Sequence, residues 1–392
     1  MTRVAGAWLE AEGTQAVLGA LARAGHKALA VGGCVRNALL GQPVADVDIA
    51  TDAPPDRVIE IARDAGLKAV PTGIEHGTVT LVAGGRGFEV TTFRRDVETD
   101  GRRAVVAFTD LLEEDAARRD FTMNALYAEA DGRVIDPLAG LADLRARRVR
   151  FVGRAEDRIR EDYLRILRFF RFHAWYGDAA AGPEPEGLAA CARLAGGIAG
   201  LSRERLGAEM RKLLAAPDPA QSVAAMAHAG VLAAVLPGAR NDAGAALVRL
   251  VAAERAAGAA PGWPRRLAVL GDPEAAALLR LSRAQAVRQA TIGAALAAAA
   301  PAAATAWRHG TEAARDAALL RAAETGRPLP AGLEAEMARG AAARPPVAAR
   351  DLPGLEGPTL GAALRAIEAE WLASDLHATR AELLARHHAR HG

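Results

Sequence analysis

Cysteine is almost absent from this chain, which has only Cys34 and Cys191 among its 392 residues. Neither belongs to a Cys-x-x-Cys pair, so the sequence offers no disulfide framework and no cysteine zinc site. Aromatic residues are also few, at 4%, although hydrophobic residues as a whole make up 51%. The core must therefore consist largely of alanine, leucine and valine, and a chain of this length predicts about two to four domains.

The chain also lacks a strong net charge and a clear membrane segment. Its formal net charge is +2, so a nucleic-acid partner would need a local basic face. The N-terminus lacks the long apolar core of a signal peptide. The uncharged stretch 290–307 is mostly alanine and contains Gly293 and Pro301, which favours a soluble helical hairpin over a membrane span. We therefore expect a cytoplasmic protein that does not contact membranes.

Residues 28–51 contain the most informative pattern in the sequence. An apolar run predicts a buried strand, Gly32-Gly33 predicts a turn, and residues 34–40 predict a helix that ends at Gly41. Residues 44–49 predict a second strand, on which Asp46 and Asp48 would share one face. Two carboxylates beside a glycine turn and a helix N-terminus suit Mg²⁺ and a phosphate. Each motif alone is usually a turn or a solvated strand, but together they favour nucleotidyl transfer.

Further strands and helices are expected around this pattern. Periodicity predicts helices over 7–26 and 56–65, and strands over 67–70, 78–83 and 87–94. Glu89 on the last of these strands would add a third, catalytic carboxylate if its register placed it beside Asp46 and Asp48. The alternative is a structural or solvent-facing glutamate, and period two alone leaves the choice open.

Two charged stretches follow. Residues 94–103 predict a solvated hairpin or a mobile loop. Residues 118–126 predict the start of a helix, in which Arg118, Arg119 and Asp120 would form an ordinary charged first turn. The same residues, with Asn124 one turn later, would also place a guanidinium on phosphates and an amide on a ribose hydroxyl.

From residue 157 onward the pattern is helical. On a single helix, Asp162 and Arg165 would lie close together, with Arg168 and Arg171 following around its surface. Acid–arginine pairs at this spacing are common on helix surfaces. Such a pair can also recognise a base. An aspartate that accepts a hydrogen bond beside an arginine that donates one matches the edges of cytosine and adenine, whereas guanine and uracil present the reverse order of donor and acceptor.

The rest of the chain predicts alanine-rich helices, with no internal repeat and no catalytic constellation beyond residue 215. The histidines near the end of the chain, at 387, 388 and 391, predict a frayed terminus, with weak RNA contact as the alternative.

Four of these motifs, in this order, resemble the class II tRNA nucleotidyltransferase and poly(A) polymerase family. They are Gly32-Gly33-Cys-Val-Arg36, Asp46-Val-Asp48, Arg118-Arg119-Asp120-Phe-Thr-Met-Asn124 and Glu161-Asp162-Tyr-Leu-Arg165-Ile-Leu-Arg168-Phe-Phe-Arg171. The resemblance covers residues 28–215 and implies an α+β fold. A polymerase-β-type nucleotidyltransferase head with a mixed sheet would be followed by an all-α neck, body and tail. It places the catalytic head at 1–145, the neck with the base-recognition helix at 146–216, and the RNA-binding body and tail at 217–392.

The resemblance also implies roles for individual residues. Asp46 and Asp48 match Mg²⁺ ligands, and the strand pattern over 87–94 adds Glu89 as a further catalytic carboxylate. The nucleotide-binding positions it implies are Gly33, Arg36, Arg119, Asp162, Arg165, Arg168 and Arg171, and the charged stretch 118–126 adds Asp120 and Asn124 as further candidates. The expected partners are the tRNA 3′ end, CTP and ATP, without an obligate protein partner. In this interpretation the enzyme adds CCA to tRNA by a two-metal mechanism and releases pyrophosphate.

One position departs from the family, and several functions stay open. Asn37 stands where the family usually has Asp, which removes a possible ionic partner of Arg36. CC-only addition, A-only addition and poly(A) tailing share these motifs, although an intact stretch 94–103 favours full CCA addition. Outside the family, the alternatives are a small-molecule nucleotidyltransferase and a non-catalytic RNA-binding protein.

Overall fold

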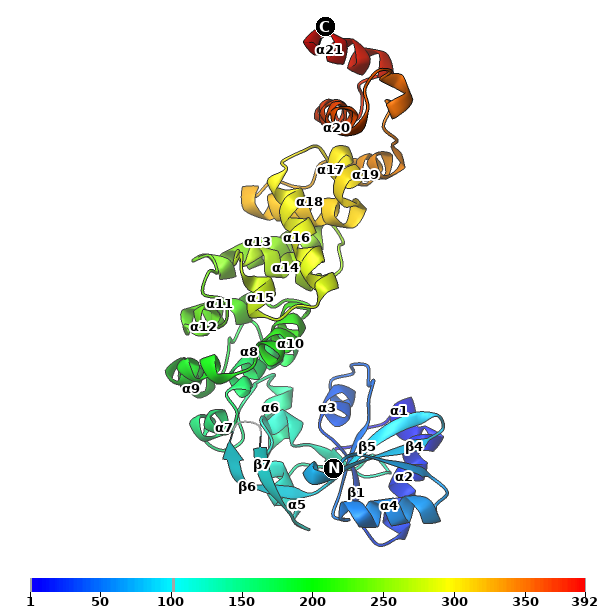
Figure 1. Ribbon diagram of the computed structural model, residues 1–392. Coiled ribbons are helices and arrows are strands. Elements are labelled where there is room, and N and C mark those ends of the chain that lie inside the picture. Colours follow the sequence, from blue (N-terminus) through cyan, green and yellow to red (C-terminus); the bar gives the residue numbers. More distant parts are fainter. Residues whose placement is uncertain (1, 101–102, 392) are drawn as a thin grey trace. The chain divides into compact units, whose positions relative to one another are not determined.

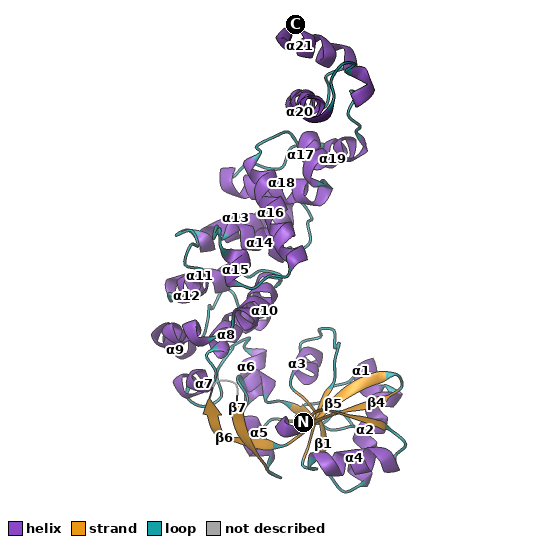
Figure 2. Ribbon diagram, in the orientation of Figure 1, coloured by secondary structure: helices purple, strands orange, loops and turns teal. Residues whose placement is uncertain are grey.

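A computed structural model describes residues 2–100 and 103–391 (Figure 1, Figure 2). The chain forms two compact units. The first consists of Met1–Leu201 and His228–Ala234, and the second of Ser202–Ala227 and Val235–Gly392. Every strand of the described residues belongs to the first unit. The expected division into head, neck, body and tail at 145/146 and 216/217 remains a prediction.

A seven-stranded sheet organises the first unit, in the order β3-β4-β5-β2-β1-β8-β9. Its strands are β1 (Ala28–Val31), β2 (Asp48–Thr51), β3 (Lys68–Gly73), β4 (Thr78–Ala83), β5 (Arg86–Thr92), β8 (Tyr127–Ala128) and β9 (Val134–Ile135). β2 pairs with β5 in parallel, whereas the other pairs are antiparallel. The mixed sheet that the resemblance implied is therefore confirmed.

Helices with apolar faces pack around this sheet. They are α1 (Ala7–Glu10), α2 (Glu12–Arg23), α3 (Gly33–Leu39), α4 (Pro55–Asp64), α5 (Leu112–Ala117) and α6 (Gly140–Arg145). α2 contacts β1, β4 and α4, and it buries Val17, Leu18 and Leu21 completely. A second cluster joins Leu29 of β1 to Phe93 and Tyr127. Burial of these side chains is the main source of the stability of the unit.

A separate two-stranded sheet follows the large one. β6 (Arg94–Asp100) pairs with β7 (Arg103–Phe108) in antiparallel register, with an irregularity between Asp96 and Glu98. The predicted hairpin is therefore confirmed. Residues 101–102, which belong to the stretch 94–103, lie outside the described residues.

Three sequence-based elements differ from the structure. The strand expected over 44–49 exists but its predicted start is wrong: β2 begins only at Asp48, so Asp46 precedes it and the two aspartates do not share a strand face. The expected helix over 118–126 is wrong too, because Arg118 caps the end of α5 and only a short 3₁₀ turn, η2 (Thr122–Asn124), follows. The single helix expected around 161–172 is divided at Asp162, whose backbone is extended, into α7 (Ala155–Glu161) and α8 (Leu164–Tyr176).

The rest of the chain is helical. Its helices are α9 (Pro185–Leu194), α10 (Arg203–Leu214), α11 (Ala220–His228), α12 (Val231–Val235), α13 (Ala243–Ala256), α14 (Trp263–Val269), α15 (Ala275–Leu278), α16 (Arg283–Ala297), α17 (Ala302–His309), α18 (Thr311–Thr325), α19 (Leu333–Ala342), α20 (Gly357–Ala373) and α21 (Arg380–His391). α16 and α17 form the helical hairpin expected at 290–307. The frayed terminus was wrong, because residues 380–391 form α21, where His387 is buried. Among the described residues, no helix is both long and apolar enough to cross a membrane.

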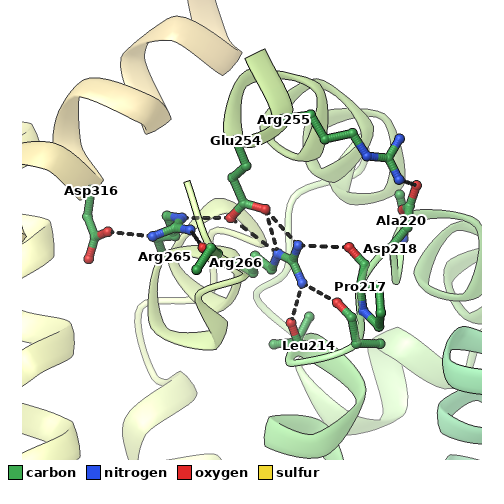
Figure 3. A network of polar contacts seen from close by, with 11 residues as sticks. Leu214, Pro217, Asp218, Ala220, Glu254, Arg255, Arg265, Arg266 and Asp316 are labelled. Carbon is green, nitrogen blue, oxygen red and sulfur yellow. Dashed lines mark hydrogen bonds and ion pairs between the residues drawn. The ribbon is translucent and has the colours of Figure 1, made fainter. Parts of the chain in front are cut away.

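A buried polar network joins four helices of the second unit (Figure 3). Arg266 of α14 donates to the Leu214 carbonyl at the end of α10, at 2.8 Å, and to Glu254 of α13, at 2.6 Å. Arg265 donates to the same Glu254 at 2.6 Å and to Asp316 of α18 at 3.0 Å. All four charged side chains are buried. Each therefore depends on its partners for the interactions that water would otherwise supply.

Candidate active site

Three carboxylates gather at one end of the parallel strand pair. The register of β2 and β5 places Asp48 directly beside Glu89. Because paired residues of neighbouring strands project from the same face, their side chains are neighbours. Asp46 lies two residues before β2, in a segment without regular structure, and all three carboxylates are exposed. The strand register thus resolves the position of Glu89, which the sequence left open.

The charges of these carboxylates repel one another. Partial desolvation raises the pKa of Asp48, the nearby charge of Glu89 raises it further, and Arg119 opposes both. Within the described residues, no group of three His, Cys, Asp or Glu side chains converges closely enough to hold a metal. Mg²⁺ requires fewer protein ligands, since one or two carboxylates with water and substrate phosphates suffice. The hard oxygens of Asp46 and Asp48 therefore fit such an ion.

A glycine turn lies close to an arginine of the site. Gly32 has φ 74°, a conformation that favours glycine, and it leads into α3 at Gly33. A Cβ atom at Gly32 would lie 3.6 Å from Nη1 of Arg119. The predicted glycine turn and the predicted arginine are therefore neighbours in space.

Arg36 on α3 is buried and held by several partners. Its Nη1 donates to Oδ1 of Asn124 at 2.5 Å, and its Nη2 donates to the hydroxyl of Tyr176 at 2.8 Å. The guanidinium also lies over the Tyr176 ring, 4.0 Å from its centroid. Burial lowers the pKa of Arg36 from its ordinary value. Arg36 therefore connects α3 to η2 and to α8.

Asn37 is a partner of Arg36 although it carries no charge. Its Oδ1 accepts from Nη2 and Nε of Arg36, at 2.9 and 3.2 Å, and its Nδ2 donates to the Pro43 carbonyl at 3.0 Å. The amide thus offers an acceptor to the guanidinium and a donor to the segment that leads to Asp46. The ionic partner that Asp would supply is replaced here by an uncharged acceptor for the Arg36 guanidinium.

Asp120, Asn124 and Arg168 form a second connection to α8. Oδ1 of Asp120 accepts from Asn124 at 2.8 Å, and Oδ2 accepts from Nε of Arg168 at 2.8 Å. Burial alone would raise the pKa of Asp120, but the charge of Arg168 and these hydrogen bonds hold it below its ordinary value. The side chain of Asp120 therefore fixes other residues of the site.

The break between α7 and α8 changes the expected Asp162–Arg165 pair. The two residues do not lie one turn apart on a single helix; instead, Oδ1 of Asp162 accepts from the Leu164 N–H at 3.1 Å at the start of α8. Arg165 forms an ion pair with Glu161 and donates to the Arg158 carbonyl at 2.9 Å. Both residues still meet at this turn, because the Arg165 N–H donates to the Asp162 carbonyl at 2.9 Å.

Three guanidinium groups surround one ring of α8. Arg171, Arg36 and Arg168 lie 4.5, 5.2 and 5.4 Å from the centroid of Phe172. Because an aromatic face attracts cations, the ring holds these positive charges close together. This side of α8 therefore gathers three guanidinium groups, of which that of Arg168 is ion-paired with Asp120.

Sequence reasoning missed three residues that organise the site: Asp115, Tyr127 and Tyr176. Asp115 is buried and bound by both arginines of the Arg118-Arg119 pair. Its spacing of three and four residues from them was a usable signal. Tyr127 and Tyr176 are distant in sequence from their partners, and no local pattern identifies them.

Comparisons with known proteins agree with this arrangement. Residues 28–150 match the "Poly A polymerase head domain" family, and residues 183–242 match the "Probable RNA and SrmB- binding site of polymerase A". The chain is 44% identical over 204 residues to the mitochondrial CCA tRNA nucleotidyltransferase 1 of Mus musculus, covering 52% of this chain and 47% of that protein. It is 44% identical over 220 residues to the CCA-adding enzyme of Geobacillus thermodenitrificans, covering 56% and 52%. The matched region thus spans about half the length of these curated relatives.

Solved structures match over more of the chain. The Bacillus stearothermophilus CCA-adding enzyme in complex with CTP is 31% identical, with a TM-score of 0.76, and the match covers 97% of this chain and 98% of that one. The Thermotoga maritima CCA-adding enzyme complexed with tRNA is 20% identical, with a TM-score of 0.68, and shares the fold. The fold is that of proteins with a polymerase-type nucleotidyltransferase head. Within that class, the chain belongs to the family of the CCA-adding enzymes.

Proposed function

We propose that this chain adds C and A nucleotides to the 3′ end of tRNA, using CTP, ATP and Mg²⁺ and releasing pyrophosphate. The observation that carries the proposal is the Asp48–Glu89 register, with Asp46 two residues before it, in a head whose sequence matches polymerase heads. Relatives described as CCA-adding enzymes favour CCA over poly(A) or partial addition. We propose the cytoplasm as its compartment, because tRNA, CTP and ATP occur there together.

Different residues of the chain would bind the metal and the triphosphate. Asp46 and Asp48 would hold Mg²⁺, which when bound lowers the pKa of the RNA 3′-hydroxyl and neutralises phosphate charge. Glu89 adds negative charge on the same sheet face. The arginines bind and orient the triphosphate, since transfers of this kind depend mainly on positioning and charge stabilisation. Nucleotide-binding residues in this proposal are Gly33, Arg36, Arg119, Asp120, Asn124, Asp162, Arg165, Arg168 and Arg171.

The proposal also assigns functions to the parts of the chain. We propose residues 1–145 as the catalytic head, 146–216 as the neck, and 217–392 as the body and tail that hold RNA. Choice of base would occur at the turn between α7 and α8. There, a carboxylate that accepts and a guanidinium that donates would match the hydrogen-bonding edges of cytosine and adenine.

An end-addition assay tests this function directly. The substrates are tRNA transcripts that lack A, CA or CCA and an unrelated RNA, each offered Mg²⁺ with single or mixed nucleoside triphosphates. Growth of every tRNA to the same CCA end is the expected result. Long A tails would instead identify a poly(A) polymerase, and no incorporation on any RNA would favour a small-molecule or non-catalytic role.

The first prediction concerns the two aspartates. Asp46→Ala or Asp48→Ala should abolish addition, while RNA binding stays close to that of the wild type, because the loss is confined to the metal site. Asp56→Ala, which removes an exposed carboxylate from α4, is the matched control and should retain activity. Activity in either site variant would refute the assignment.

A further inference from the structure

A buried carboxylate organises the Arg118-Arg119 pair. Oδ1 of Asp115 accepts from Nη2 and Nε of Arg118, at 2.8 and 2.9 Å, and Oδ2 accepts from Nη2 of Arg119 at 2.9 Å. Only 1% of the Asp115 side chain is exposed. A carboxylate in such a place is stable only when charged donors surround it. Asp115 is therefore committed to these two arginines.

Tyr127 completes the arrangement from the neighbouring strand β8. Its hydroxyl donates to Oδ2 of Asp115 at 2.7 Å and accepts from Nε of Arg119 at 3.1 Å. Two nitrogens of the Arg119 guanidinium are thereby fixed. Because the guanidinium is planar and rigid, fixing two of its nitrogens sets the direction of the third.

That third nitrogen faces the glycine turn. Nη1 of Arg119 lies 3.6 Å from the position that a Cβ atom would take at Gly32. A side chain at Gly32 would therefore begin in van der Waals contact with Nη1, and glycine leaves that space beside Nη1 open. A phosphate oxygen is the acceptor that suits a guanidinium N–H beside such a turn.

We propose that Asp115 and Tyr127 are positioning residues that direct Nη1 of Arg119 at a phosphate of the nucleoside triphosphate beside Gly32. The inference rests on the proposed function, since it assigns the support behind one of its nucleotide-binding residues. Neither Asp115 nor Tyr127 touches the nucleotide itself. Their effect reaches the substrate through the orientation of Arg119.

The chain contains a close structural match to Asp115 that serves as a control. Asp143 on α6 is also buried, and it accepts from Arg148 and Arg150 at 2.8 Å and from the Thr122 hydroxyl at 2.7 Å. Both aspartates therefore bind two arginines and one hydroxyl. A purely structural role predicts the same consequences for both when the charge is removed.

The test compares Asp115→Asn, Tyr127→Phe and Asp143→Asn in the full chain. Binding of CTP and of cytidine is measured by calorimetry, and thermal unfolding is recorded for each variant. We expect Asp115→Asn and Tyr127→Phe to weaken CTP binding about tenfold, the scale of one hydrogen bond to a charged group, and to change cytidine binding less than about twofold. Asp143→Asn should lower thermal stability and leave both affinities unchanged.

Each other outcome overturns the inference. Unchanged CTP affinity in Tyr127→Phe, which keeps the buried ring and should fold, would show that Arg119 needs no such support. Equal losses for CTP and cytidine would indicate general disruption of the site. If the wild type binds no CTP, the proposed function fails as well. If the wild type binds CTP and the two variants bind it with the same affinity, only the positioning role is refuted.

Discussion

Asn37 illustrates how a single atom decides what a side chain can hold. Its oxygen accepts from the Arg36 guanidinium, and its nitrogen donates to the Pro43 carbonyl. An aspartate at this position would keep the acceptor, with added charge, but would lose the donor. An alanine would lose both. Comparison of Asn, Asp and Ala at position 37 therefore distinguishes the contribution of the Arg36 contact from that of the Pro43 contact.

We predict an order of stability for variants of Asn37. Asn37→Ala should lower the free energy of unfolding by about 1–3 kcal/mol, because the buried Arg36 loses an acceptor. Asn37→Asp should cost less, because the carboxylate still binds the guanidinium. Urea unfolding of the three proteins measures this order, with Asn241→Ala, a change at an exposed residue, as the control. Equal losses in both variants would assign the effect to the Pro43 contact.

Arg165 provides a second prediction at the residue scale. Its guanidinium is held at the turn between α7 and α8 by Glu161 and by the Arg158 carbonyl. Arg165→Ala should loosen the choice of C and A over G and U more than it lowers total incorporation, since the donor for the base would be lost. Single-nucleotide incorporation rates measure the ratio. Unchanged discrimination would contradict a role in base choice.

At the scale of elements, the sequence predicted those with local signals. α3 and α4 were recognised from apolar periodicity and a glycine stop, and β4 and β5 from strict alternation. The break at Asp162 was missed because no proline or glycine marks it. The start of β2 was misplaced because residues 44–47 alternate like a strand although β1 pairs only from Asp48 onward.

The candidate site shows the same limit. The four motifs supplied every residue of the predicted site except Glu89, because each has a distinctive local spacing, whereas Glu89 came from the strand pattern over 87–94. Their mutual contacts were beyond prediction, since the Asp48–Glu89 register and the Asp120–Arg168 bond join segments far apart in the chain. Period two and helical spacing define faces, whereas only tertiary packing selects partners.

The polar network of Figure 3 gives a prediction at this scale. Arg266→Ala should lower the free energy of unfolding by about 3–5 kcal/mol, because it removes a partner of the buried Glu254 and leaves the Leu214 carbonyl without this donor. Arg255→Ala, on the neighbouring helix α13, removes only a surface pair with Asp218 and should cost about 1 kcal/mol or less. Denaturant unfolding of both variants measures the difference. Similar small losses in both would show that the network contributes little to stability.

At the scale of the molecule, buried carboxylates of the first unit make its stability depend on pH. Burial alone would raise the pKa values of Asp115, Asp120 and Asp143, but arginines and hydrogen bonds hold all three below the ordinary value. A depressed pKa in the folded state stabilises the protein above the unfolded pKa of about 3.9. This stability is lost as the pH falls through the folded values.

The corresponding prediction compares the wild type with Asp143→Asn. The wild type should be clearly more stable at pH 7, and the difference should shrink as the pH falls below about 4, because the wild-type carboxyl is then protonated too. Urea unfolding, monitored by hydrogen exchange, measures the stability of the first unit separately from that of the second. A difference that stays constant between pH 7 and pH 3 would contradict the depressed pKa.

The contact between Arg36 and Tyr176 also sets an order of events during synthesis. These residues lie 140 positions apart, so a ribosome that adds about 5–20 residues per second needs on the order of ten seconds between them. From the addition of Asp48 until residue 164 is reached, the emerging chain contains Asp46 and Asp48 but not α8. The chain at that stage therefore holds these carboxylates without the arginines of α8, and the contacts of Arg36 and Asp120 with α8 form only after α8 has been translated.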